Sequence, residues 1–465
     1  MFHPQLYDVV LTLSKAELRR CAKLVRSPFF THRSEMERMF SYLAICLYRG
    51  KPLPDKATLF QKSFPEKPFD DLLLRATMSD LKELIEEFLV WQKMRMDSTK
   101  AGIMLAAEYR KRNLSKFFEK TAQRLEKEMK QAEVQNVDFL QRRLDFQLEM
   151  AQFQTRTKRA TELPLQEISN SLDTVYLAQK LRHACTQLSH QAVFKMKYDF
   201  GLLPNVIGEV EQGGYLDTPA VALYYFCFRF LTKADGLPFF LKFREELRQH
   251  GHYFPDDELK DLYLLAINFC IRKLNEGEVP FIKEGWELYQ DGLEKGFLIE
   301  HGRLSAFTFN NVVAFGIRLK EYQQVERFIE KYQSKLDPSQ QESFVHFNHA
   351  RLEYAKGDLK GALGYLQTAD FSDLVNNLIA KTLQMRIYFE MGEFDLLDSH
   401  LDSFRSFIRR RELSDFHHRN YTNIISYMKK IMTVPPGDRA ASNKLRQQIQ
   451  DEKLLSEKSW MLKQI

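Results

Sequence analysis

The clearest indication of the fold is the sequence NHARLEYAKGDLKGALGYLQTA, residues Asn348–Ala369. Its first half places Ala350 and Tyr354 one helical turn apart, and the turn Lys356–Asp358 then interrupts this spacing with a glycine. Glycine enters the left-handed backbone region that ends many helices without a steric cost. The second half returns to helical spacing of apolar side chains, at Leu359, Ala362, Leu363 and Leu366. The sequence therefore predicts a helical hairpin.

The same turn recurs elsewhere in the chain. Lys320–Tyr322, Gly357–Leu359 and Gly392–Phe394 each join a Gly or Lys, an acidic residue and an apolar residue that begins the next helix. These turns follow one another at intervals of 37 and 35 residues. Helix pairs are predicted at Val221–Lys233 with Pro238–His250, Asp256–Asn275 with Pro280–Lys295, Ser305–Leu319 with Glu321–Tyr332, and Ala380–Met391 with Asp395–Arg409. A near-constant period of turns indicates a helical-repeat array.

Length and composition support several helical units. The chain has 465 residues, more than the roughly 250–300 at which a single hydrophobic core stops growing. Hydrophobic residues make up 44% and aromatic residues 13% of the sequence, which excludes wholesale disorder. Only 19 Gly and 15 Pro interrupt the chain, and no stretch shows sustained two-residue alternation. We therefore expect an all-α fold.

Cysteine usage and hydropathy exclude several classes of protein. The five cysteines are odd in number and far apart, without a CxxC motif, so neither a disulfide framework nor a zinc site is predicted. The N-terminus lacks the pattern of a signal peptide. The longest apolar run, Ala220–Leu231, is interrupted by Arg229 and is too short to span a bilayer. We expect a soluble, cytoplasmic protein without a membrane partner, metal or cofactor.

Three segments are predicted. Residues 1–100 form an N-terminal helical module, with capping boxes at Ser14–Glu17 and Ser34–Glu37. Residues 101–433 form the repeat solenoid, in which the clearest repeats lie at 301–411. Residues 434–465 form a C-terminal cap, with one amphipathic helix from about Ser442 to Trp460 that covers the last exposed face of the array.

The repeats resemble tetratricopeptide (TPR) units, which recur at ~34 residues. The match covers Ala350, Gly357, Asp358, Ala362, Leu366 and Ala369, while His346 and His349 stand where the family has bulky apolar residues. The whole chain, from SPFF near its start to the KSWMLKQI ending, also resembles a bacterial family of TPR-like proteins seen mainly in Bacteroidota. This resemblance implies an α-solenoid of antiparallel helical hairpins, a TPR-like superhelix, and supplies no activity.

The repeat alignment also suggests a binding surface. Asn311 and Asn348 occupy the same position of the first helix, and Asn268 joins them if the following loop carries an insertion. Arg351 and Arg386 share a second position one turn further on. In peptide-binding TPR proteins these positions face the concave groove, so the resemblance implies that they bind an extended, acidic segment of a protein. The alternative is that Asn is common in this helix for solubility and contacts between repeats.

A basic segment offers a different function. Residues 101–160 contain 13 Lys and Arg against 8 Asp and Glu, a net charge of +5. Lys116, Lys120, Arg124 and Lys127 form a stripe opposite the apolar seam of Leu114, Phe118, Leu125 and Met129. The stripe predicts either binding of RNA or another nucleic acid or an ordinary solvated face. The aromatic residues lie on the packing side, which favours the solvated face.

Catalytic motifs are absent from the sequence. No phosphate-binding glycine loop, HExxH, nucleophile elbow or dinucleotide fingerprint occurs. His183 and Cys185 are two residues apart on a predicted helix that begins near Asp173, and so cannot face one ion. The pair His346 and His349 has no third ligand. Asp415–His418 is predicted to be a polar loop between helices, with an acid–base or anion site as the alternative. We therefore expect a non-catalytic scaffold, with an enzyme of unrecognised type as the third hypothesis.

Overall fold

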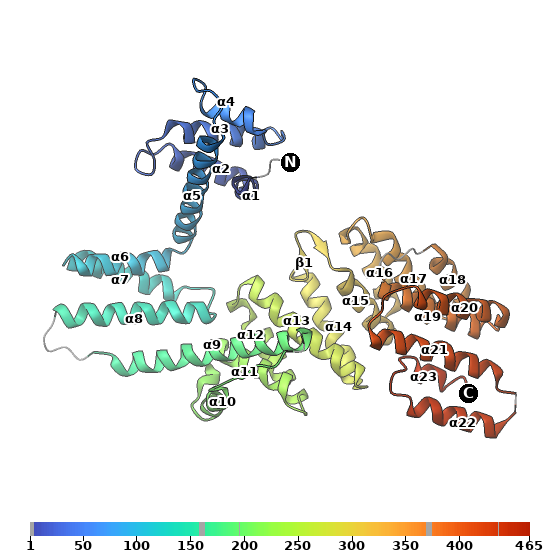
Figure 1. Cartoon of the computed structure of the whole chain (residues 1–465). Coiled ribbons are helices and arrows are strands. Elements are labelled where there is room, and N and C mark those ends of the chain that lie inside the picture. Colours follow the sequence, from blue (N-terminus) through green and yellow to red (C-terminus); the bar gives the residue numbers. More distant parts are fainter. Residues whose placement is uncertain (1–3, 158–162, 195, 369–373, 436) are drawn as a thin grey trace. The chain divides into compact units, whose positions relative to one another are not determined.

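The computed structural model describes residues 4–157, 163–194, 196–368, 374–435 and 437–465 (Figure 1). Within these ranges the chain is all-α, as predicted, apart from one antiparallel pair of two-residue strands, β1 (Ile299–Glu300) and β2 (Arg303–Leu304). No helix in the described ranges combines the length and apolar character needed to cross a bilayer.

The chain divides into two compact units. The first contains residues 1–182 and 202–221, and the second contains residues 183–201 and 222–465. Helices α9 (Leu165–Phe194) and α11 (Pro219–Thr232) each contribute residues to both units. The predicted boundary after residue 100 is therefore not the main division, although the helices before it enclose a core of their own.

That N-terminal core is built by α1 (Gln5–Thr12), α2 (Lys15–Val25), α3 (Ser34–Tyr48), α4 (Lys56–Ser63) and α5 (Asp71–Met96). The predicted capping box at the start of α2 is confirmed: the Ser14 amide donates to Glu17 Oε2 at 2.8 Å, and the Glu17 amide donates to Ser14 Oγ at 3.3 Å. The second predicted box is wrong. Ser34 is the first helical residue of α3, and its hydroxyl accepts from Arg38 instead.

The rest of the first unit continues as helices that pack along their length. These are α6 (Ser98–Lys111), α7 (Ser115–Lys130), α8 (Val137–Thr157), the first part of α9, α10 (Leu203–Gln212) and the 3-10 turn η1 (Tyr215–Asp217). Figure 1 shows α6, α7 and α8 lying side by side. Phe118 of α7 stacks on Phe153 of α8 at 3.9 Å between ring centroids. Because α9 already begins at Leu165, Asp173 lies inside the helix and does not cap it.

The second unit is a succession of α-helices, and most neighbours in the sequence pack against each other. It contains the rest of α9 and α11, then α12 (Leu237–His250), η2 (Gly251–Tyr253), α13 (Asp256–Asn275), α14 (Pro280–Glu294), α15 (Ala306–Arg318), α16 (Tyr322–Tyr332), η3 (Gln333–Lys335), α17 (Gln341–Lys356), α18 (Leu359–Thr368), α19 (Leu374–Glu390), α20 (Phe394–Arg409), α21 (Asp415–Thr433), α22 (Arg439–Asp451) and α23 (Lys458–Met461). Every helix pair predicted from the sequence is present, and the two members of each pair from α13 to α20 pack against each other. Ala369, at the end of the stretch quoted first, lies outside the described residues.

The three recurring turns share one backbone geometry. Lys320, Gly357 and Gly392 have φ angles of 61°, 91° and 74°, in the left-handed region. In each turn the next residue's amide bonds back to a carbonyl five positions earlier, at 2.9 Å in all three. These backbone hydrogen bonds at the helix end satisfy carbonyl groups that would otherwise lack partners. The turns predicted from the sequence are therefore confirmed as equivalent.

Two predictions near the C-terminus need correction. Asp415–His418 is the first turn of α21 rather than a loop, because the Ser414 hydroxyl accepts from the His417 amide and caps the helix. The predicted final helix is two helices, α22 and α23, with an irregular segment between them. Asn420 and Asn423 hold this segment: the Ser456 amide donates to Asn420 Oδ1 at 2.8 Å, and Asn423 Nδ2 donates to the Leu454 carbonyl at 3.0 Å.

Candidate binding grooves

Within the second unit, alternate helices enclose a groove of about 560 Å³. Its walls come from α15, α17, α19 and α21 and from the segment before α23. The lining residues include Ala314, Arg318, Phe347, Arg351, Tyr354, Ile379, Leu383, Arg386, Phe416, His417, Asn420, Tyr421, Ser456 and Glu457. We call this the arginine groove. Most of its wall is apolar, with charged groups concentrated at three arginines and one glutamate.

The repeat turns explain why the arginines meet. Arg351 and Arg386 each precede the left-handed residue of their turn by six positions, and Ala314 occupies the same place in the preceding repeat. Equivalent positions on successive parallel helices face the same side of an array. The structure accordingly brings Arg351 and Arg386 together in one groove.

Arg351 is a partly buried cation with no acidic partner. Its Nη1 donates to the Asn310 carbonyl at 3.0 Å and to Asn348 Oδ1 at 3.1 Å, and its guanidinium lies 5.5 Å from the centroid of the Phe347 ring. No carboxylate in the described part of the chain pairs with it. Burial, together with repulsion from Arg318, lowers the pKa of Arg351 to about 10. The side chain therefore stays charged at neutral pH.

Arg318 brings a second positive charge to the rim of the groove. Its side chain is exposed, but the surrounding protein removes enough water to lower the pKa of its guanidinium. Over the described ranges it forms no ion pair or hydrogen bond. The rim and wall of the groove thus carry two neighbouring cations without a compensating carboxylate.

Arg386 is compensated in part. It forms an ion pair with Glu457, and its guanidinium lies 5.3 Å from the centroid of the Trp460 ring. Its Nε is nevertheless buried without a hydrogen-bond acceptor in the described chain. Glu390, on the same helix, accepts from the Tyr354 hydroxyl at 2.6 Å and from Trp460 Nε1 at 2.7 Å. The C-terminal segment therefore forms one wall of the groove and supplies its acidic residue.

Asn348 does not reach the groove. Its side chain is fully buried, and its Nδ2 donates to Asn310 Oδ1 at 2.6 Å and to the Phe344 carbonyl at 2.8 Å. With its oxygen accepting from Arg351, the amide links α15 to α17 and orients the arginine. The predicted direct contact between Asn348 and a partner segment is therefore replaced by a positioning role. The spacing of residues along a helix does not distinguish a side chain that contacts a partner from one that is buried and orients its neighbours. Along one helix face, some positions are covered by neighbouring helices and others stay exposed.

The other two predicted asparagines line a second groove, of about 770 Å³. We call this the asparagine groove; it is bordered by residues of α13, α14 and α15 and by the β1–β2 turn. Asn268 is exposed, whereas Asn311 is partly buried and interacts with the buried Tyr289. Lys260 forms an ion pair with Glu300, and Arg303 forms one with Asp337. The positive and negative charges of these four groove residues therefore cancel. The five predicted residues are thus divided between two grooves and one buried network.

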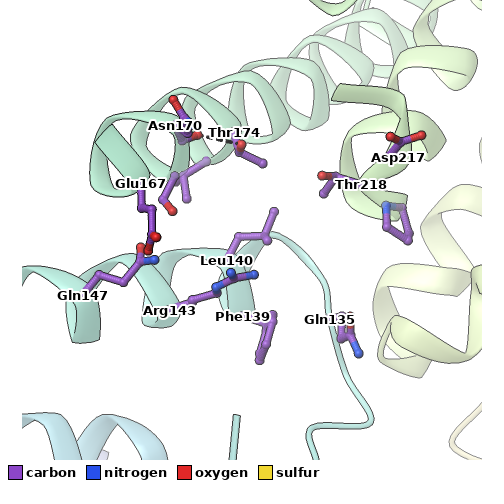
Figure 2. A pocket seen from close by; sticks show the side chains of 13 residues that line it. Gln135, Phe139, Leu140, Arg143, Gln147, Glu167, Asn170, Thr174, Asp217 and Thr218 are labelled. Carbon is purple, nitrogen blue, oxygen red and sulfur yellow. Dashed lines mark hydrogen bonds between the residues drawn. The ribbon is translucent and has the colours of Figure 1, made fainter. Parts of the chain in front are cut away.

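The first unit contains a polar pocket of about 440 Å³ (Figure 2). Figure 2 shows Arg143 of α8 opposite Glu167 and Asn170 of α9, with Asp217 and Thr218 beyond. Acidic and basic side chains both line this pocket, and among the described cations of the basic segment 101–160 only Arg143 contributes to it. The pocket therefore gives no support to a phosphate-binding channel.

The stripe Lys116, Lys120, Arg124 and Lys127 lies exposed on α7, outside that pocket. Arg124 pairs with Glu128 at 3.0 Å, one turn along the helix. Of the predicted seam, Phe118 and Leu125 are buried, while Leu114 is exposed. The α7 surface combines paired and unpaired cations, as a solvated helix face commonly does.

The histidines form no metal site in the described chain, where no group of three potential ligands gathers. His349 stacks on Tyr365 with 5.0 Å between ring centroids, and burial lowers its pKa. Cys185 is buried and donates to the Tyr224 carbonyl at 3.6 Å. His417 belongs to the arginine groove. These contacts account for the histidine and cysteine patterns as packing.

Sequence reasoning missed Arg318 and Glu457. Arg318 lies four positions after Ala314, on the same helix face, so the repeat alignment carried a signal for it. Glu457 carried none, because it reaches the groove only through the break between α22 and α23. No family model, curated protein or solved structure matches this chain. The chemistry of the grooves themselves therefore carries the functional argument.

Proposed function

We propose that this chain is a non-catalytic, TPR-like helical-repeat scaffold that binds an acidic segment of a partner protein. The proposed site is the arginine groove, on the concave side of a superhelix formed by the first helices of successive hairpins. One observation carries the proposal: Arg318 and Arg351 are neighbouring cations, and neither has a carboxylate partner among the described residues. Five buried, free cysteines suit a reducing compartment such as the cytoplasm.

The physical basis is electrostatic compensation. Two like charges in a partly dehydrated groove repel each other, and each loses some of its hydration. A carboxylate that enters between them relieves both effects and accepts hydrogen bonds in the forked geometry that guanidinium groups favour. The unpaired Nε of Arg386 offers a further donor in the same groove.

The groove also suits a polypeptide rather than a bare anion. Ile379 and Phe416 line it and remain 42% and 58% exposed. An apolar side chain of a bound segment covers such residues and removes their surface from water, which contributes about 25 cal/mol per Å². The combination favours a segment that carries acidic and apolar residues together.

The test is a binding measurement with fluorescent peptides. Short peptides that alternate Glu with Leu or Phe are compared, by anisotropy, with matched peptides that carry Gln in place of Glu. We expect tighter binding of the acidic set, and a loss of about tenfold or more in the Arg318→Gln, Arg351→Gln double variant, because charge-assisted hydrogen bonds are removed. The control is Arg327→Gln, an exposed arginine on α16 outside the groove. Equal binding of acidic and neutral peptides would contradict the proposal.

A second candidate function is association with RNA through α7. It is favoured by Lys116, Lys120 and Lys127, which are exposed and lack ion pairs in the described residues. Phosphate contacts release counterions, so such binding weakens steeply with added salt. Absence of any binding to mixed RNA at low salt would remove this candidate.

A further inference from the structure

One face of α15 borders both grooves. Phe307 and Asn311 line the asparagine groove, and Ala314 and Arg318 line the arginine groove. These four residues follow one another at spacings of four, three and four, so they lie within about 60° of one another around the helix. Phe307 is 75% exposed, and Arg318 is exposed at the other end of the stripe.

From this stripe we infer that a single extended segment occupies both grooves, with an acidic residue at Arg318 and Arg351 and a bulky apolar residue over Phe307. The inference rests on the proposed function and adds the register of the bound segment. The bound segment is a stretch of polypeptide in which the acidic and the apolar side chains are a fixed distance apart.

The length of the stripe sets that distance. Phe307 and Arg318 are 11 positions apart on α15, which corresponds to about 16 Å along the helix axis. An extended chain advances about 3.3 Å per residue. The acidic and apolar residues of the segment are therefore separated by about five residues.

The chemistry between the two ends matches a peptide backbone. Asn268 and Asn311 offer amide donors and acceptors along the asparagine groove, and peptide groups need both. The ion pairs that border this groove leave it without a positive excess. A nucleic acid carries a negative charge on every residue, and the cations of this groove, Lys260 and Arg303, are already paired with Glu300 and Asp337. An acid at one end and an apolar residue at the other suits the charge distribution better.

The experiment uses the full chain and fluorescent peptides that contain one Glu-Glu pair and one Phe. Spacers of Gly, Ser and Ala separate the two by about one, three, five, seven or nine residues, in both orders. We expect affinity to peak at about five in one order. At the peak, affinity should exceed that of a peptide without Phe by about tenfold, the usual effect of burying one aromatic side chain.

Three variants test whether the peak in peptide affinity depends on the residues of the α15 stripe. Phe307→Ser, at an exposed position, should abolish the preference for one spacing without weakening the peptide that lacks Phe. Arg318→Gln should weaken all acidic peptides, and Arg327→Gln should weaken none. Because all three positions are exposed, circular dichroism should show an unchanged fold.

The outcomes separate the inference from the proposed function. Acidic peptides that bind with equal affinity at every spacing overturn the inference and leave the proposed function in place. Acidic peptides that fail to bind overturn both. Full displacement of the best peptide by single-stranded RNA would overturn the inference by making a nucleic acid the occupant of the stripe.

Discussion

Replacing Asn348 with Ala tests whether this asparagine acts inside the protein or on a ligand. The side chain is fully buried and takes part in three hydrogen bonds, two as donor and one as acceptor. Removing it leaves Asn310 Oδ1 and an N–H of Arg351 without this partner. An unsatisfied buried polar group costs about 1–3 kcal/mol. We expect a loss of about 2–4 kcal/mol in the free energy of unfolding.

Urea unfolding followed by circular dichroism measures this loss, and Asn311→Ala is the matched comparison. Asn311 occupies the equivalent repeat position but is only partly buried, and its side chain interacts with Tyr289. Its removal should cost about 0.5–1.5 kcal/mol. The reasoning is refuted if the Asn348 variant loses no more stability than the Asn311 variant. It is also refuted if the Asn348 variant keeps full stability and loses peptide affinity, since that result places Asn348 in contact with a ligand.

Three further predictions concern packing, the C-terminal wall and pH. Gly316→Ala should lower the free energy of unfolding by about 1–3 kcal/mol in the same urea assay, because a Cβ there would clash with Val325 Cγ2. An unchanged midpoint would contradict the packing. Glu457→Gln should tighten binding of acidic peptides by about two- to fivefold in the anisotropy assay, since it frees the Arg386 charge, and weaker binding would count against the groove. Burial lowers the pKa of His349 in the folded state. Below the unfolded pKa of about 6.5, the unfolded chain binds a proton at this residue more readily than the folded chain does, so the free energy of unfolding falls as the pH is lowered. Above that pKa the residue is neutral in both states and its contribution to stability is fully present. The urea midpoint should therefore drop between about pH 7.5 and 5.5 by less in His349→Gln than in the parent chain.

Much of the secondary structure was predictable because its signals are local. A left-handed residue that ends a helix depends on the chemistry of a few neighbours, and so Lys320, Gly357 and Gly392 located three hairpins before any tertiary contact was known. The capping box at Ser14 is equally local. The predictions that depended on longer-range contacts were less successful: the C-terminal helix is divided because Asn420, on another helix, binds the segment inside it.

In the candidate site, too, the features that depend on local sequence were predictable and those that depend on longer-range contacts were not. Local sequence signals predict that the chain is all-α and place Arg351 and Arg386 at one repeated position, because helical period and turn spacing depend on residues that are close together in the chain. The tertiary structure buries Asn348 and leaves the charged Arg351 without a carboxylate partner in the described chain. It also decided that Glu457, far along the sequence, joins the same groove. Burial and charge compensation depend on which helices come together in space, and helical periodicity alone does not specify this.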